Sequence, residues 1–279
     1  TDVDGTVDLA EIDVAGTVTA RIDAGGADIS GLSENLTDVT DYIIDTSDTL
    51  TMTATQASAK GVTGGGAVAL SSLQATTDLS GVTATGGVTI DLANTSVEMT
   101  TGKIGATALT VNSTGGSASI DVDGIGADMA ATSIALGTGV TLDATATQLS
   151  GNAVTGTATV NVSGLESAAS ADLSGIVATH TATASLNAAT AVNLAADLST
   201  VDALNISGSD TVTVLDGAEL TDGVTSVALS ETAALSLTAA DAVLLSTVSG
   251  TGNAVTVTAL DDTPTADLSR IHADLSLTV

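Results

Sequence analysis

The chain has 279 residues, with no Phe, Trp or Cys, one Tyr, one Pro, two His and four Lys or Arg. Its 33 Asp and Glu give a formal net charge of −29, which argues against a nucleic-acid partner or an anionic membrane surface, and no apolar run is long enough to insert into a membrane. Because catalysis commonly uses His, Cys, Lys or Arg, this composition also argues against an enzyme.

Strand-like segments recur along the chain. Thr and Val suit a half-buried strand, while the 29 Gly and many Asp suit tight turns. Segments of this kind begin near Leu50, Ala67, Gly87 and Ala106, then near Val140, Ala158 and Ala203, and finally near Leu235, Ala254 and Ala273. A short strand with such regular spacing buries its apolar face by stacking on its neighbours. The predicted fold is therefore all-β, a parallel β-solenoid of roughly 19-residue coils.

The predicted coils of roughly 19 residues belong to a longer sequence repeat. The motif Asp-Leu-Ser occurs at Asp78, Asp172 and Asp267, so the long repeat is about 94 residues, or five predicted coils. We interpret residues 1–279 as one continuous repeat domain, with copies at 50–141 and 142–234, a partial copy at 235–279 and part of a preceding copy at 1–49. The alternative is a row of immunoglobulin-like β-sandwiches, whose modules have a similar length but usually hold a large aromatic core residue.

Three segments with apolar residues at three- and four-residue steps predict short helical turns between strands, at 33–45, 187–201 and 238–248. Ser33 and Thr238 are the expected N-caps. A solenoid interior is narrow, which explains why Ala, Val, Leu and Ile fill it without aromatic rings.

Metal binding is the chemistry that the residues favour, because Asp beside Gly in a turn supplies the oxygen ligands that Ca²⁺ prefers. None of the candidate stretches completes an EF-hand loop, and each Asp could also serve as a turn residue that bonds its own backbone. His180 and His272 lie beside no catalytic motif. The candidate metal ligands are Asp2, Asp4, Asp121, Asp123, Asp128 and Asp210.

The repeats TATQLSGNAVTGTATVNVSGLE, AADLSTVDALNISGSDTVTVLDGAEL and TAADAVLLSTVSGTGNAVTVTAL resemble those of large repetitive bacterial surface proteins, a group that includes type I-secreted adhesins and S-layer proteins. The resemblance implies a β-solenoid, export to the cell surface, frequent calcium dependence, and a role in a coat, a filament or attachment. The calcium nonapeptide of that group is approached at SGSDTVTV around Asp210, which lacks the tandem glycines.

These observations predict a non-catalytic, extracellular structural protein that assembles with copies of itself into a surface layer or filament, or forms a stalk, with calcium bridging its acidic faces. The alternative is an adhesin module that binds a cell-surface glycan or a protein. Residues 1–20 lack the pattern of a signal peptide and the chain does not begin with Met, so we expect it to be a portion of a longer secreted protein.

Overall fold

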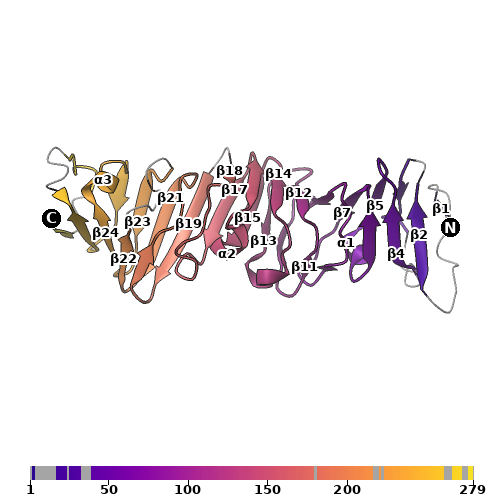
Figure 1. Cartoon of the computed structure of the whole chain (residues 1–279), viewed down its shortest axis with the longest axis horizontal. Coiled ribbons are helices and arrows are strands. Elements are labelled where there is room, and N and C mark those ends of the chain that lie inside the picture. Colours follow the sequence, from indigo (N-terminus) through magenta and orange to yellow (C-terminus); the bar gives the residue numbers. More distant parts are fainter. Residues whose placement is uncertain are drawn as a thin grey trace. The chain divides into compact units, whose positions relative to one another are not determined.

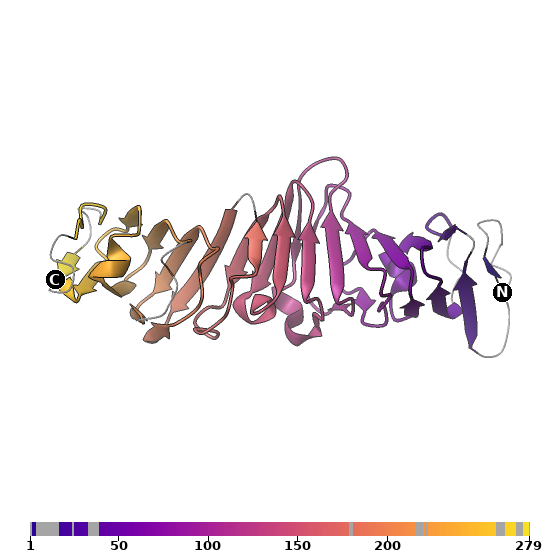
Figure 2. The ribbon, with the colours of Figure 1, turned by 45° about the horizontal axis from the view of Figure 1, so that its top comes forward.

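The computed structural model describes residues 2–3, 17–23, 25–32, 39–178, 181–215, 220, 223–260, 266–271 and 276–278. Strands make up 48% of the chain and helices 8%, and stacked coils form a β-solenoid of about 11 turns. Neighbouring strands pair in parallel, as the successive arrows in Figures 1 and 2 show. The predicted solenoid is confirmed, and the sandwich alternative is wrong because immunoglobulin-like sheets are antiparallel.

Contacts between residues divide the chain into two compact units, Thr1–Leu142 with Gly156–Ala158, and Asp143–Thr155 with Thr159–Val279. The division after Leu142 coincides with the start of the second sequence copy. We describe each unit by itself.

Among its described residues, the first unit contains four sets of paired strands. One sheet has the order β1 (Asp2–Val3), β2 (Val18–Ile22), β4 (Val39–Ile44), β6 (Gly61–Gly64). A second contains, in order, β3 (Ala27–Asp28), β5 (Thr49–Thr53), β7 (Ala67–Ser71), β9 (Val88–Asp91), β12 (Ala108–Asn112) and β14 (Ser133–Leu136). A third begins β10 (Ser96–Glu98), β13 (Ala118–Asp121), β15 (Val140–Thr145), and β8 (Asp78–Leu79) pairs with β11 (Lys103–Ile104). The helices are α1 (Ala54–Ala57) and the 3₁₀-helix η1 (Asp123–Asp128).

The second unit follows the same plan. One sheet runs β17 (Thr159–Ser163), β19 (Thr181–Ala188), β21 (Ala203–Gly208), β23 (Ser226–Leu229), β25 (Thr247–Ser249). Another runs β20 (Val192–Leu194), β22 (Thr211–Val214), β24 (Ala234–Thr238), β26 (Ala254–Thr258), β27 (Ser276–Thr278), and β16 (Ala153–Gly156) neighbours β18 (Ile176–Ala178). The helices whose residues the structure fully describes are α2 (Ala146–Leu149) and α3 (Ala239–Ala242).

Alternation along each strand separates the core from the surface. In β7, for example, Val68 and Leu70 are buried, while Ala67, Ala69 and Ser71 are half-buried on the outer face. The core consists mainly of Ala, Val, Leu and Ile, as expected for a narrow interior. Met52, Met99 and Tyr42 are also fully buried, and burial raises the pKa of Tyr42 to about 12.

Coil length varies more than the sequence predicts. Leu50 pairs in register with Val68, whereas Leu109 pairs with Ile134, which lies considerably further along the chain from its partner.

The number of coils per copy also differs from the predicted five. After β5, the chain adds β7, β9, β12 and β14 to the same sheet and then reaches β15 in a different sheet. After β15 it likewise adds β17, β19, β21 and β23 before β24. Each copy therefore makes between four and five coils, and the next copy starts in a different sheet.

One of the predicted helical turns is confirmed. α3 lies within 238–248, and the hydroxyl of its N-cap Thr238 accepts a hydrogen bond from the N–H of Asp241. The helix predicted at 187–201 is wrong, because its central residues form β20. In 33–45, residues 39–44 form β4, and Ser33 lies outside the described residues.

Candidate functional site

The predicted metal ligands of the first unit lie around β13 and η1. The carboxylate of Asp121, at the end of β13, accepts a hydrogen bond from the N–H of Asp123 at 3.0 Å. Asp128 ends η1, and its Oδ1 is 3.7 Å from Nζ of Lys103 in β11. Asp2 lies in β1, and neither its side chain nor Asp4 belongs to the part of the chain that the structure describes. The carboxylate of Asp121 therefore serves a local turn, and that of Asp128 forms an ion pair.

Asp210 lies in the second unit, in the turn before β22, where its carboxylate accepts a hydrogen bond from the N–H of Thr211 at 2.8 Å. Within the described ranges, no three His, Cys, Asp or Glu side chains lie close enough together to hold a metal ion. The candidates are thus distributed over separate turns. Both histidines, His180 and His272, fall outside the described residues.

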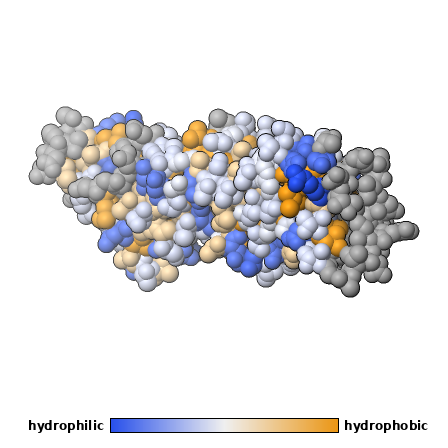
Figure 3. All heavy atoms as spheres, turned by 45° about the vertical axis from the view of Figure 1, so that its right-hand side comes forward, coloured by the Kyte–Doolittle hydropathy of each residue, from blue (hydrophilic) through white to orange (hydrophobic). Residues whose placement is uncertain are grey.

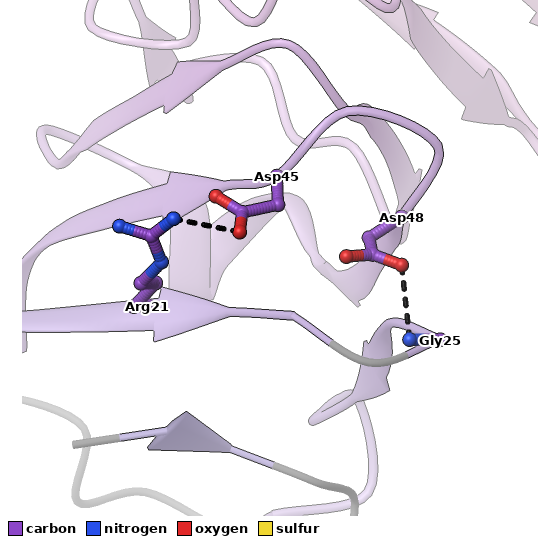
Figure 4. Close-up of polar contacts among 4 residues, drawn as sticks. All are labelled: Arg21, Gly25, Asp45 and Asp48. Atoms are coloured by element: carbon purple, nitrogen blue, oxygen red, sulfur yellow. Dashed lines mark hydrogen bonds and ion pairs between the residues drawn. The ribbon is translucent and has the colours of Figure 1, made fainter.

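The acidic side chains commonly close turns or link neighbouring coils. Figure 4 shows two such contacts: the carboxylate of Asp45, directly after β4, lies 2.7 Å from the guanidinium of Arg21 in β2, and Asp48 accepts a hydrogen bond from the N–H of Gly25 at 2.9 Å. Each contact joins residues of successive coils that are far apart in sequence. The carboxylates therefore help to hold successive coils in register at their edges.

A recurring turn has the form Asp-x-Ser. In each case the Asp carboxylate accepts a hydrogen bond from the N–H of the Ser two residues later, at 2.9 to 3.1 Å; the aspartates are Asp28, Asp78, Asp172, Asp197 and Asp267. Hydrogen bonds from the Ser side chain and N–H lower the pKa of Asp28, Asp78, Asp172 and Asp267. These four aspartates therefore stay ionised at neutral pH.

Some of these turns stack on one another. In the first unit, Lys103 pairs in register with Asp78, and its ammonium lies near Asp128 of the following coil. In the second unit, Asp172 pairs in register with Asp197. Lys103 follows Asp78 in the sequence by the same interval as Asp197 follows Asp172, so Lys103 and Asp197 occupy equivalent positions in two copies. The stack in the first unit thus contains a lysine next to its aspartate, whereas the stack in the second unit contains two neighbouring aspartates.

The outer strand faces are different from the turns. Strands β16 to β27 contain no Asp, Glu, Lys or Arg. Their outward residues form in-register rows across neighbouring coils, such as Asn161, Thr183, Ala203, Ser226 and Thr247. On the face shown in Figure 3, residues of intermediate hydropathy predominate and strongly hydrophilic residues form separate groups. Among these strands of the second unit, the charge is therefore confined to the turns, whereas strands of the first unit, such as β9 and β15, also contain carboxylates.

Hollows at two places on the described surface of the first unit lie beside its strands. One, of about 240 Å³, lies over the outer faces of β7, β9, β12 and β14 and is lined only by uncharged residues. The other, of about 460 Å³, lies beside β10, and its lining contains a single ionisable side chain, Glu98. Neither hollow could be predicted from the sequence, because both depend on which strands become neighbours.

Comparisons with known proteins add no relative: no family model, no curated protein and no solved structure matches the chain. No helix among the described residues is long and apolar enough to cross a membrane.

Proposed function

We propose that this chain is a non-catalytic structural segment of an extracellular bacterial protein, which assembles through its solenoid sides into a surface layer or filament. The observation that supports this proposal best is the separation of charge from the strand faces of β16 to β27. Two copies that approach through their turns bring carboxylates together, whereas two copies that approach through β16 to β27 bring only hydroxyl, amide and aliphatic groups together.

Calcium enters the proposal at the acidic turns. A chain with a net charge of −29 repels its copies, and divalent cations in solution reduce that repulsion by screening and by bridging carboxylates of neighbouring molecules. In this arrangement the strand faces provide the contact area and the cations allow the turns to come close. The cations bind between molecules, so assembly depends on calcium even without a preformed cage in each copy.

Negative-stain electron microscopy and sedimentation velocity would test the proposal. Purified chain is compared in millimolar CaCl₂, in NaCl of equal ionic strength, and in EDTA. We expect ordered sheets or filaments in calcium, less assembly in NaCl, and separate particles after chelation. Separate particles under all three conditions, up to high protein concentration, would contradict self-assembly.

A matched pair of variants distinguishes contact through the strand faces from contact through the turns. Asn205→Asp places a carboxylate on the exposed face of β21, and Asn94→Asp makes the same chemical change in an exposed turn where Asn94 already has a positive φ of 62°. We expect Asn205→Asp to weaken assembly strongly and Asn94→Asp to raise only the calcium concentration that is needed. Equal effects of the two changes would mean that the strand face is not the contact.

A further inference from the structure

β10 is an edge strand in the interior of the sequence. It begins its sheet, and among the described strands its only partner is β13. The N–H of Met99, directly after β10, donates to the carbonyl of Asp121. Because hydrogen bonding alternates along a parallel strand, Val97 also faces β13, and the N–H and C=O groups of Ser96 and Glu98 point to the opposite side. That side of β10 presents unpaired backbone groups of the kind that accept an added strand.

The hollow of about 460 Å³ lies on this open side. Its far wall is the turn Leu73–Ala75 of the preceding coil, and the carbonyl of Ala75 accepts a hydrogen bond from the N–H of Thr100. This bond joins the two coils at one end, and between Leu73–Ala75 and Ser96–Glu98 they separate. The hollow is therefore a groove with an apolar residue, Leu73, in one wall and a strand edge in the other.

The charge beside the groove is negative. Glu98 is exposed and pairs in register with Asp121 of β13, so two carboxylates lie on neighbouring strands at the same level. Among the described residues that line the groove, none has a basic side chain. An acidic segment of a second copy is disfavoured here, whereas a Lys or Arg on the incoming strand is attracted to Glu98.

The same edge recurs in the second unit. β20 begins a sheet whose next strand is β22, and Ala195, directly after β20, donates its N–H to the carbonyl of Ala169 in the preceding coil. This bond corresponds to that between Thr100 and Ala75. Asn193, two residues before Ala195, takes the position that Glu98 has in β10. Both units thus have an open edge at corresponding strands, and only the first carries the carboxylate.

We propose that the open edge of β10 binds an extended segment of a partner protein, which adds as a strand beside Ser96–Glu98 and places a Lys or Arg next to Glu98. Backbone hydrogen bonds to Ser96 and Glu98 provide the binding, and the basic residue provides the preference. This interaction is independent of self-assembly through the strand faces and makes the chain an anchoring point for a second protein.

Nuclear magnetic resonance of the ¹⁵N-labelled chain in EDTA tests this proposal. The probe is a pentapeptide, Thr-Val-Lys-Val-Thr, with acetylated and amidated ends, and its counterparts have Glu in place of Lys or carry N-methyl groups on every amide. We expect saturable shifts of the amides of Ser96, Val97 and Glu98 with the Lys peptide. We expect at least threefold weaker binding with the Glu peptide and none with the N-methylated peptide.

Two variants assign the contacts. Glu98→Gln should weaken binding of the Lys peptide about threefold, while Asp210→Asn, which removes the same charge from a turn in the second unit, should leave it unchanged. Ser96→Pro removes one N–H that faces the groove, and proline is tolerated at such edge positions, so it should abolish binding without changing the rest of the amide spectrum. Absence of shifts at millimolar peptide, shifts spread over the acidic turns, or equal binding of the N-methylated peptide would each overturn the proposal.

Discussion

The stacked turns of the first two copies differ in one side chain. In the first copy, Lys103 follows Asp78 by one coil and lies 3.7 Å from Asp128, while in the second copy Asp197 takes the position of Lys103 and follows Asp172. The backbone pairs in parallel in both. The turn is thus held by its backbone and by the side chains inside the coil, and the outward position accepts either sign of charge.

This difference separates two kinds of interaction. Inside the coil, Leu79 and Leu173 follow the two aspartates and are almost completely buried, with exposed fractions of 1% and 0%. Outside, Lys103 and Asp128 have side-chain exposures of 43% and 55%, at which ion pairs contribute little to stability. We therefore expect the two copies to respond alike to changes inside the coil and differently to changes outside.

The largest expected effect is in the core. Leu79→Ala and Leu173→Ala should each lower the free energy of unfolding by about 2–5 kcal/mol, because each leaves a cavity in a narrow interior. Hydrogen exchange followed residue by residue measures the loss in each copy, which matters because long repeat arrays need not unfold as one unit. Ser80→Ala, on the outer side of the same turn, is the control. Clearly unequal losses for the two Leu variants would show that the interiors are not equivalent.

Next in size are the helix caps that the copies share. The Thr53 hydroxyl accepts from the N–H of Gln56 at 3.1 Å and the Gln56 side chain accepts from the N–H of Thr53 at 2.7 Å; Thr145 and Gln148 repeat the arrangement. Thr53→Ala and Thr145→Ala should each cost about 1 kcal/mol, measured by the same exchange experiment. Thr53→Ser, which keeps the oxygen, should cost much less. If the Ala and Ser variants were equal, the cap would not stabilise the turn.

The strand starts could be predicted because outward polar or small residues alternate regularly with inward apolar residues. Segments predicted near Ala67, Val140, Ala203 and Ala254 begin at those residues, as β7, β15, β21 and β26. In each of these strands, outward Thr, Ser, Ala, Asn or Asp alternates with inward Val, Leu or other apolar residues. That pattern is local, so it can be recognised without knowing which strands pair.

Other features depend on non-local pairing or on ambiguous residues. The segment 187–201 contains many Ala, which suit a helix and a strand interior alike, so its apolar spacing fitted a helix although Val192 and Leu194 point inward from β20. The capping boxes lie in the repeated TATQ motif, where Thr followed by Gln three residues later is a recognised helix-start signal, although no helix was expected there. The open edge of β10 depends on which strands become neighbours, which no single segment reveals.

Reversing the charge at position 103 or 197 should have a smaller effect, and it directly tests the difference between the two stacked turns. Lys103→Asp should give the first copy the carboxylate arrangement of the second and lower its stability by roughly 0.5–1 kcal/mol at low salt. Asp197→Lys should raise the stability of the second copy, since it replaces one of two neighbouring carboxylates with an ammonium group. Both changes should shrink in 1 M NaCl, where the Debye length is about 3 Å. A salt-independent effect would indicate altered packing instead of electrostatics.

The smallest expected effect is on titration of the stacked aspartates. The hydroxyl and N–H of Ser80 lower the pKa of Asp78, to which Lys103 adds, whereas the pKa of Asp172 is lowered by Ser174 without a neighbouring cation. Lys103→Gln should therefore raise the pKa of Asp78 and leave that of Asp172 unchanged, as measured from the ¹³C shifts of the carboxyl carbons. Ser174→Ala should raise the pKa of Asp172 alone.

The sign of the linked stability change follows from these shifts. Because the folded pKa values lie below the ordinary value of 3.8, ionised Asp78 and Asp172 stabilise the fold above that pH, and the stabilisation is lost as the pH falls through the folded pKa. Each variant should thus reduce the dependence of stability on pH in its own copy below about pH 4. If Lys103→Gln shifted both aspartates equally, the two stacks would titrate as one system and would not be independent local turns.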